Sequence, residues 1–209
     1  QMKDKKNICI IPNGKLSNIP FQSLGTNDTQ GNFHFLVEDY AIFYTNKMDI
    51  FSKPHETANI NKSFIALGNP DKSLPNASEE VKNFSGIVKN AAIYTEGEAT
   101  ETKATEGLSN YQYVHFATHG ILDYADFEKS YLVFAPEKNV SSDGKLTIEK
   151  INGLTISNCS LVTLSACETA VSKEAVKGWY ISPANSFLQN NVSSVVASLW
   201  QVDDKATSV

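Results

Sequence analysis

A histidine and a cysteine each follow a run of apolar and β-branched residues in this 209-residue chain. His119 comes after residues 114–118 and directly precedes Gly120, and Cys167 comes after residues 161–166. A cysteine attacks as its thiolate, and a neighbouring imidazole can take up the thiol proton. The backbone N–H groups of Gly120 and Cys167 could then stabilise an oxyanion. These residues are therefore candidates for a nucleophilic centre if the fold brings them together.

The surrounding pattern predicts where these residues lie. Strand-like and helix-like segments alternate through the second half, and several strands are continuously apolar, which is typical of a parallel sheet covered on both faces. Functional groups in such sheets gather beyond the carboxyl ends of the strands. We therefore predict an α/β fold, with His119, Cys167 and the pair Asp203 and Asp204 at one edge of a mostly parallel sheet.

The individual elements follow from apolar spacing and from turn residues. Residues 26–32 indicate a surface loop or hairpin tip, and residues 172–180 indicate a mobile loop. The expected strands are residues 8–11, 35–37, 40–44, 63–68, 92–95, 114–118, 131–135, 161–166 and 194–200. The expected helices are residues 77–90, 102–109 and 147–152, and a further helix that begins at Pro183.

A less reactive interpretation exists for each candidate. His119 can be a hydrogen-bonded polar residue and Cys167 an inert buried thiol, and spacing alone favours this interpretation. His115 faces the same side of its strand as His119 but lies deeper, which favours a buried, hydrogen-bonded structural role. The remaining cysteines and histidines are expected to be inert thiols and surface residues, respectively; they are Cys9, Cys159, His34 and His55.

Composition excludes several classes of protein. The net charge is −5 and all 18 basic residues are lysine, so we expect no direct nucleic-acid binding and no arginine-based pocket for carboxylates or phosphates. No segment is long and apolar enough to cross a membrane. Three irregularly spaced cysteines give no disulfide framework and no zinc pattern, so a cytoplasmic setting is expected. Nucleotide-loop, metalloprotease and serine-hydrolase motifs are absent, and we expect neither metal nor cofactor.

The residues after the last expected strand have several interpretations. Asp203 and Asp204 can be a solvated chain end or metal ligands, although companion ligands are lacking. Trp200 is most simply a core or pocket-wall aromatic residue. A redox role for Cys167 would need a resolving cysteine nearby. Cys159 lies at the far end of the same expected strand and is too distant to form a disulfide with Cys167.

Three motifs together resemble the CHAT domain, a caspase-like family related to separase. They occupy residues 115–120, 164–169 and 194–204, in the same order as in the family, and each lies at the end of an expected strand. The resemblance covers nearly the whole chain, because residues 11–14 and 67–70 also match the family pattern. Residues 177–183 depart from the glycine-rich, small-residue approach to the helix before the last strand that is usual in the family.

The resemblance implies a caspase–hemoglobinase fold and a cysteine peptidase dyad in which His119 is the general base and Cys167 the nucleophile. It also implies that Asp204, and less strongly Asp203, helps to hold a basic P1 side chain, with Trp200 nearby. Since caspase cleavage after aspartate depends on arginine, we expect a basic or apolar P1 residue instead. The expected partners are a protein or peptide substrate and an upstream tetratricopeptide-repeat region or regulatory complex, in a bacterial cytoplasm.

Two functions remain open at this stage. The first is a cysteine endopeptidase switched on by a partner domain or complex, with residues 172–180 as the segment that reorders. The second is a catalytically silent CHAT-like module with a regulatory or scaffolding role. We expect residues 1–209 to form a single domain, excised from a longer chain and shortened at the C-terminus, where family members continue with another helix.

Overall fold

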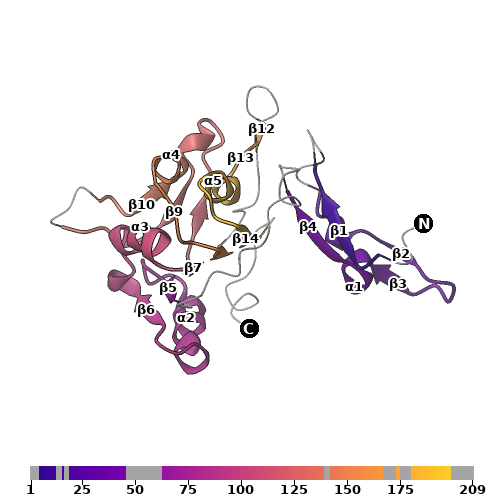
Figure 1. Ribbon diagram of the computed structural model, residues 1–209, viewed down its shortest axis with the longest axis horizontal. Coiled ribbons are helices and arrows are strands. Elements are labelled where there is room, and N and C mark those ends of the chain that lie inside the picture. Colours follow the sequence, from indigo (N-terminus) through magenta and orange to yellow (C-terminus); the bar gives the residue numbers. More distant parts are fainter. Residues whose placement is uncertain are drawn as a thin grey trace. The chain divides into compact units, whose positions relative to one another are not determined.

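The computed structural model describes residues 5–12, 16, 19–45, 63–138, 142–166, 173–174 and 180–198, with only the backbone described at 173–174 and 180–181. The chain divides into two compact units, Gln1–Ala58 and Asn59–Val209. Both units contain strands, which Figure 1 shows in indigo for the first unit and in magenta to yellow for the second. The expectation of a single domain stays a prediction.

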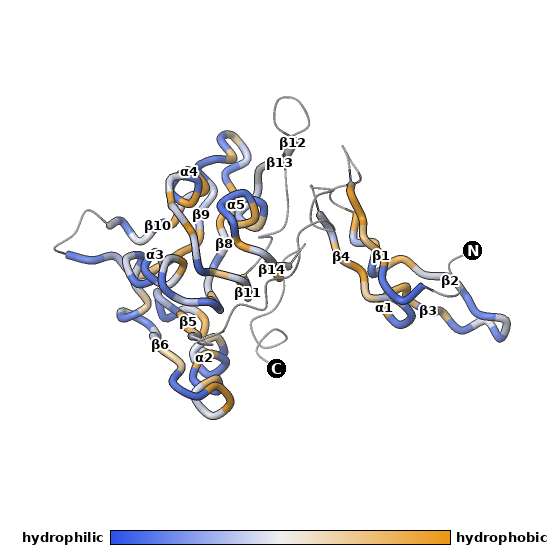
Figure 2. Tube along the Cα trace, viewed as in Figure 1, coloured by the Kyte–Doolittle hydropathy of each residue, from blue (hydrophilic) through white to orange (hydrophobic). Residues whose placement is uncertain are grey.

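The N-terminal unit is built from short strands and short helical turns. Its strands form a parallel pair, β1 (Asn7–Ile10) with β4 (Ala41–Tyr44), and an antiparallel pair, β2 (Gly25–Asn27) with β3 (Phe33–Phe35). Its helical turns are η2 (Phe21–Ser23) and α1 (Leu36–Asp39). The expected strands near residues 8–11 and 40–44 and the hairpin tip are confirmed. Figure 2 shows the hydrophilic tip between β2 and β3 and the more hydrophobic β1 and β4.

The expected strand at 35–37 is wrong. Phe35 ends β3, and Leu36 begins α1. The Phe35 N–H donates a hydrogen bond to Glu38 Oε1 at 2.7 Å, so an acidic side chain reaches back to the first turn of the helix. This local contact overrides the β propensity of the apolar residues.

The second unit contains a five-stranded, wholly parallel sheet in the spatial order β14-β11-β7-β5-β6. A second sheet, antiparallel and three-stranded, has the order β10-β9-β8. The strands of the parallel sheet are β5 (Phe64–Gly68), β6 (Ala92–Thr95), β7 (Tyr113–Ala117), β11 (Leu161–Ser165) and β14 (Ser194–Ala197). The smaller sheet contains β8 (Gly120–Ile121), β9 (Tyr131–Val133) and β10 (Lys145–Thr147).

Helices cover both faces of the parallel sheet, because successive side chains of a strand point to opposite faces. On one face, Ala66 and Ala117 pack with Val81 of α2. On the other, Leu67 and Phe116 belong to a larger core cluster, which also contains side chains of α3, α4 and α5. The helices are α2 (Pro75–Ile87), α3 (Glu101–Asn110), α4 (Ile148–Asn152) and α5 (Pro183–Gln189), with the 3-10 turns η4 (Glu96–Glu98) and η5 (Phe127–Lys129). The predicted α/β architecture is confirmed at this level.

The starts of α4 and α5 lie within one residue of the predicted starts, whereas α2 begins at Pro75 rather than at residue 77. Thr147 caps α4 by accepting from the Lys150 N–H, and Ser182 caps α5 by accepting from the Asn185 N–H. In contrast, α2 begins after Leu74 with Pro75 in its first turn and has no side-chain cap. It ends at Ile87, earlier than residue 90, and the Ile87 side chain is exposed.

The expected loop at residues 172–180 contains part of a strand pair. Backbone pairing joins β12 (Lys173–Glu174) to β13 (Tyr180–Ile181) in the antiparallel sense. The residues between these strands lie outside the part of the chain that the structure describes, so the mobility and reordering of this segment stay predictions. No helix within the described segments is both long and apolar enough to span a membrane.

Candidate active site

The candidate site lies where the strand order of the parallel sheet reverses. From β5 the chain goes first to β6 on one side, and then to β7 on the other side. After β5 it enters α2 on one face, whereas after β7 it enters the β8–β10 sheet, whose Leu132 and Leu146 join the core of the other face. Connections that diverge in this way leave a crevice at the carboxyl ends of the two strands.

His119 lies just beyond β7, at this reversal of the strand order. Its Nε2 lies 2.6 Å from Ser73 Oγ and 3.9 Å from Asp71 Oδ2. Ser73 and Asp71 belong to the connection between β5 and α2, so the facing groups come from the other strand of the reversal. The His119 side chain is about one-third exposed at 34%, which leaves the ring accessible from solvent.

Asn69 fixes the connection that carries Asp71 and Ser73. It is buried, adopts a positive φ of 51°, and donates its backbone N–H to the Ala117 carbonyl at 2.9 Å. Its side chain accepts from the Leu74 N–H and donates to Ser78 Oγ. Asparagine tolerates this left-handed conformation better than most residues. One buried side chain thus ties the end of β5 to β7 and to the beginning of α2.

Asp71 places a carboxylate beside His119. Partial burial acts to raise the pKa of Asp71, but hydrogen bonds from the Ser73 side chain and backbone, together with the nearby His119, lower it below its usual value. Ser73 Oγ lies 2.7 Å from Asp71 Oδ1, and the Ser73 N–H donates to the same oxygen at 3.1 Å. The carboxylate therefore accepts two hydrogen bonds from a single neighbour.

Hydrogen bonds also join the ends of β7, β11 and β14. The Thr118 N–H donates to the Ser165 carbonyl at 3.1 Å, and Thr118 Oγ1 donates to the Val133 carbonyl at 2.6 Å. Ser198 Oγ donates to the Ala166 carbonyl. The residue before His119 is therefore bonded to the chain two residues before position 167.

The CHAT domain model matches residues 1–209, which is the full length of the sequence. The chain belongs to the CHAT family. This family is caspase-like and related to cysteine peptidases. A search of curated proteins finds no match.

Several candidates from the sequence of this CHAT domain lie outside the described residues. They are Cys167, Trp200, Asp203, Asp204 and His55. Gly120 is described and pairs with Leu132 in the small antiparallel sheet. The roles assigned to these residues stay predictions.

His115 is buried within β7, as predicted, at 5% exposure. Its Nε2 lies 3.0 Å from Glu80 Oε1 but has no hydrogen-bond partner among the described residues, so the expected hydrogen bonding of this side chain is not confirmed at Nε2. The ring also packs on Phe84, and Ser165 Oγ donates to the second oxygen of Glu80 at 3.1 Å. His115 is thus held in the interface between α2 and the sheet.

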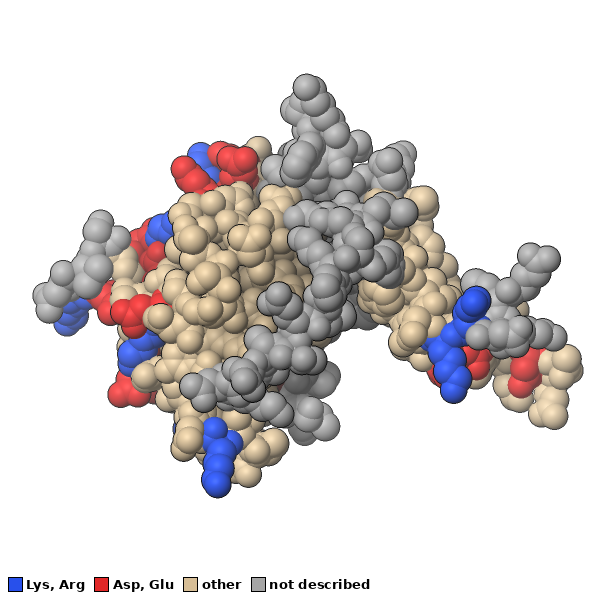
Figure 3. Space-filling model, in the orientation of Figure 1, with Lys and Arg blue, Asp and Glu red and all other residues tan. Residues whose placement is uncertain are grey.

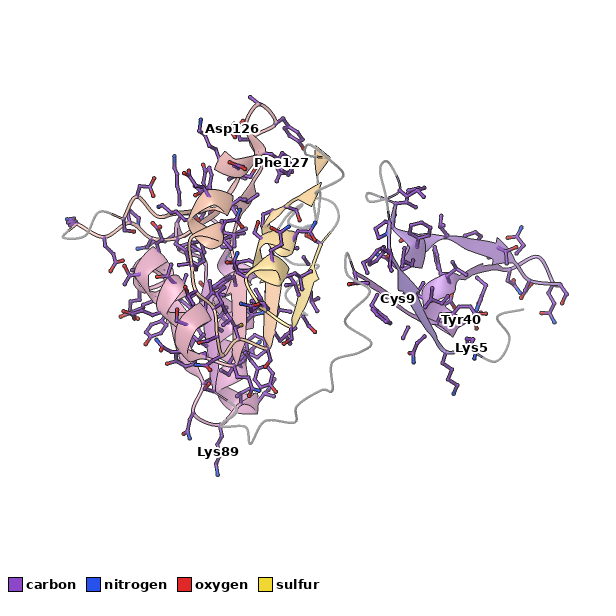
Figure 4. The ribbon with its side chains drawn as sticks, turned by 45° about the horizontal axis from the view of Figure 1, so that its top comes forward. Lys5, Cys9, Tyr40, Lys89, Asp126 and Phe127 are labelled. Carbon is purple, nitrogen blue, oxygen red and sulfur yellow. The ribbon has the colours of Figure 1, made fainter. Side chains whose placement is uncertain are left out.

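The two described cysteines differ from a reactive thiol. Burial raises the pKa of Cys159 to about 11 and outweighs a backbone hydrogen bond of Leu161 that lowers it. Burial also raises the pKa of Cys9 in β1, a residue that Figure 4 labels in the N-terminal unit. At neutral pH both groups are protonated, which is consistent with the predicted inert thiols.

His34 lies on the surface, as predicted, but it does have partners. Its nitrogens lie 3.4 Å from Glu38 Oε2 and 3.0 Å from Asp39 Oδ2. The Asp39 contact is the main cause that raises the pKa of His34. On the face in Figure 3, most lysines lie beside acidic residues, although the lysine group at the bottom of the view has no acidic neighbour there. The described residues contain no group of histidine, cysteine and acidic side chains suited to a metal ion.

Sequence reasoning missed Asp71 and Ser73. A usable signal was present, because residues 69–71 follow the apolar strand 64–68 just as His119 follows residues 114–118. The rule that places functional groups at strand ends applied to both segments. What the sequence could not supply is the strand order, which makes β5 and β7 direct neighbours.

Proposed function

We propose that this CHAT domain is a cysteine endopeptidase that hydrolyses peptide bonds of a protein substrate. His119 would be the general base and Cys167 the nucleophile, on a caspase–hemoglobinase fold. The observation that carries the proposal is the 3.1 Å hydrogen bond from the Thr118 N–H to the Ser165 carbonyl. It links the backbone beside His119 to a position only two residues before Cys167. Two residues of chain span at most about 7 Å, so the sequence keeps Cys167 close to this backbone link, which supports the proposal.

The chemistry uses groups of this chain alone. His119 takes the thiol proton of Cys167, and the thiolate attacks the substrate carbonyl carbon. The N–H groups of Gly120 and Cys167 stabilise the resulting oxyanion. The imidazolium then gives its proton to the leaving amine, and water hydrolyses the thioester with His119 acting again as base.

Specificity and control belong to the same proposal. Asp204, with Asp203 and Trp200, forms the wall of a pocket for a basic or apolar P1 side chain. The absence of arginine from the sequence supports this choice over cleavage after aspartate. Activation comes from a tetratricopeptide-repeat region or a regulatory complex.

The test is a survey of new protein N-termini in native cells that express the natural full-length protein. Cells with the wild-type protein, the Cys167→Ala variant or the His119→Ala variant are compared by mass spectrometry. The proposal predicts N-termini that occur only with the wild type, with basic or apolar residues at P1. Cys159→Ala is the matched control, because that buried thiol is protonated at neutral pH and should leave cleavage unchanged.

Identical N-termini in wild-type and Cys167→Ala cells would contradict the peptidase proposal. If Cys167→Ala also kept the biological output of the protein, the result would favour the second candidate, a catalytically silent regulatory or scaffolding module. A P1 profile dominated by aspartate would overturn the specificity proposal alone.

A further inference from the structure

We propose that Ser73 and Asp71 are positioning residues that fix the tautomer of His119 and leave its Nδ1 as the basic nitrogen. The inference rests on the proposed peptidase function for its catalytic meaning. Its geometric basis is a continuous chain of contacts, from Asp71 Oδ1 through Ser73 Oγ at 2.7 Å to His119 Nε2 at 2.6 Å.

Counting the protons between Asp71, Ser73 and His119 assigns the direction of each hydrogen bond. The Ser73 hydroxyl has one proton, and the ionised Asp71 can only accept. If Ser73 donated its proton to His119, then Ser73 Oγ and Asp71 Oδ1 would face each other at 2.7 Å as two acceptors without a proton between them. The favourable arrangement has Ser73 donating to Asp71 and accepting from a proton on His119 Nε2.

The consequence concerns the other nitrogen of the ring. A neutral imidazole carries one proton, so a proton on Nε2 leaves the lone pair on Nδ1. Nδ1 is then the nitrogen able to take up the proton of Cys167. When it does so, Asp71 balances the new positive charge, with its Oδ2 3.9 Å from Nε2. Because His119 and Asp71 are both partly exposed, this charge effect is modest and the tautomer is the main contribution.

The surrounding loop makes the arrangement persistent. Asn69 holds the backbone through bonds to Ala117, Leu74 and Ser78, and the Ser73 N–H is itself bonded to Asp71. Ser73 therefore faces His119 from a supported turn. On the other side, Thr118 ties the backbone before His119 to β9 and β11.

The first test measures the tautomer directly. The full chain is labelled with ¹⁵N-histidine, and the ring nitrogen shifts of His119 are read at a pH where the ring is neutral, with His119→Gln used for assignment. The expected wild-type signals show a protonated Nε2 and an unprotonated Nδ1. Ser73→Ala should mix the two tautomers, and Ser73→Thr, which keeps the hydroxyl, should restore the wild-type pattern. Asp71→Ala should shift the population toward a protonated Nδ1.

The matched control is Lys72→Gln in the same loop. Lys72 makes a surface contact with Glu96 at 3.4 Å, and its loss leaves the Ser73 contacts in place. We expect wild-type ring shifts in this variant. A wild-type His119 that carries its proton on Nδ1 would overturn the proposal, as would an unchanged tautomer in both Ser73→Ala and Asp71→Ala.

Kinetic measurements distinguish the positioning role of Ser73 and Asp71 from the peptidase function itself. On peptides from the N-terminal survey, Ser73→Ala should lower kcat by about 10- to 100-fold with little change in KM, which is the scale of lost orientation of a catalytic ring. Ser73→Thr should recover most of this loss. If the wild type cleaves the peptides and Ser73→Ala has the same kcat, the positioning role of Ser73 is refuted and the peptidase function is not. A chain with the expected tautomers but no Cys167-dependent cleavage refutes the peptidase function alone.

Discussion

The two units of the chain bury their apolar side chains to very different degrees. None of the described residues of the N-terminal unit is buried, and its aromatic residues Phe33, Phe35 and Phe43 are exposed. In the second unit, Phe116 and Phe187 are fully buried within one continuous core. Hydrophobic burial is the dominant favourable contribution to folding, so the second unit should hold most of the stability of the described chain.

The two units also differ in how firmly they hold the side chains that could take part in chemistry. Cys9 and His34 lie on strands of the first unit that contain no buried residue. His119 follows a strand of the second unit, and both segments beside it are fixed by buried residues, Asn69 and Thr118. A catalytic group needs such support, because small displacements of a reacting atom cost much of the rate. The comparison therefore favours the second unit as the location of the chemistry.

The largest expected effect compares one phenylalanine from each unit. Phe116→Ala removes a fully buried ring that contacts Phe134 and Phe187, and should cost about 3–5 kcal/mol of unfolding free energy. Phe33→Ala removes an exposed ring and should cost about 1 kcal/mol or less. Urea unfolding followed by near-ultraviolet circular dichroism measures both. Equal losses of unfolding free energy in the two variants would contradict the difference in burial between Phe116 and Phe33.

The next effect concerns two glycines near the same helix. An alanine Cβ at Gly68 would lie 2.6 Å from Val81 Cγ2 and 2.8 Å from the Ala77 carbonyl oxygen. Gly68→Ala should therefore push α2 away from β5 and cost about 2–3 kcal/mol. Gly86→Ala in the same helix meets no atom within 4 Å and should stabilise by about 1 kcal/mol or less. Thermal unfolding of the pair checks this, and a neutral Gly68→Ala would contradict the close packing at the start of the candidate site's loop.

A third comparison uses two carboxylates that share one lysine. Lys150 Nζ lies 2.6 Å from the largely buried Glu101 and 2.8 Å from the exposed Asp143. Glu101 also accepts from Ser142 Oγ and the Gly144 N–H. Glu101→Gln should cost about 1–2 kcal/mol, whereas Asp143→Asn should cost less than about 1 kcal/mol. Urea unfolding at neutral pH gives both values, and the reverse order would contradict the assigned burial.

The acid dependence of this cluster has a definite sign. The hydrogen bond from Lys150 is the main cause that lowers the pKa of Asp143 below 3.8. Its contribution to stability is therefore present above the unfolded value and is lost as pH falls through the lower folded value. Asp143→Asn should flatten the stability curve in that acid range, and an unchanged curve would contradict the pairing.

The smallest expected effect lies in the N-terminal unit. Because Asp39 raises the pKa of His34 above 6.5, its contribution to stability is complete below 6.5 and is lost as pH rises through the higher folded value. His34→Gln should abolish this slight dependence. Histidine NMR titration of the wild type measures the shift, and a midpoint at or below 6.5 would contradict the pairs with Asp39 and Glu38.

The sequence predicts the second unit better than the first, for a physical reason. Continuous apolar runs such as residues 64–68 and 114–118 fit a strand buried on both faces and have few alternatives. Residues 35–37 lack such a core, so a single contact from Glu38 decides between strand and helix. Local hydrogen bonds of this kind leave little trace in hydrophobic periodicity.

The candidate site shows the same limit. The pattern of apolar runs found His119 because strand and histidine are adjacent in sequence. Ser73 approaches from 46 residues away, through a strand order that periodicity does not encode. His115 was correctly placed in the buried strand, but its neighbour Glu80 comes from a helix 35 residues earlier. Contacts between elements therefore had to come from the structure.

The most direct test of the account is the reactivity of Cys167 and its dependence on His119. The full chain is treated with iodoacetamide near neutral pH, and mass spectrometry follows the alkylation of each cysteine in the wild type and in His119→Ala. We predict that Cys167 reacts much faster than Cys159 and Cys9 and slows by about 10-fold or more in His119→Ala. A Cys167 that reacts as slowly as Cys159, or equally fast without His119, would contradict a His119–Cys167 dyad.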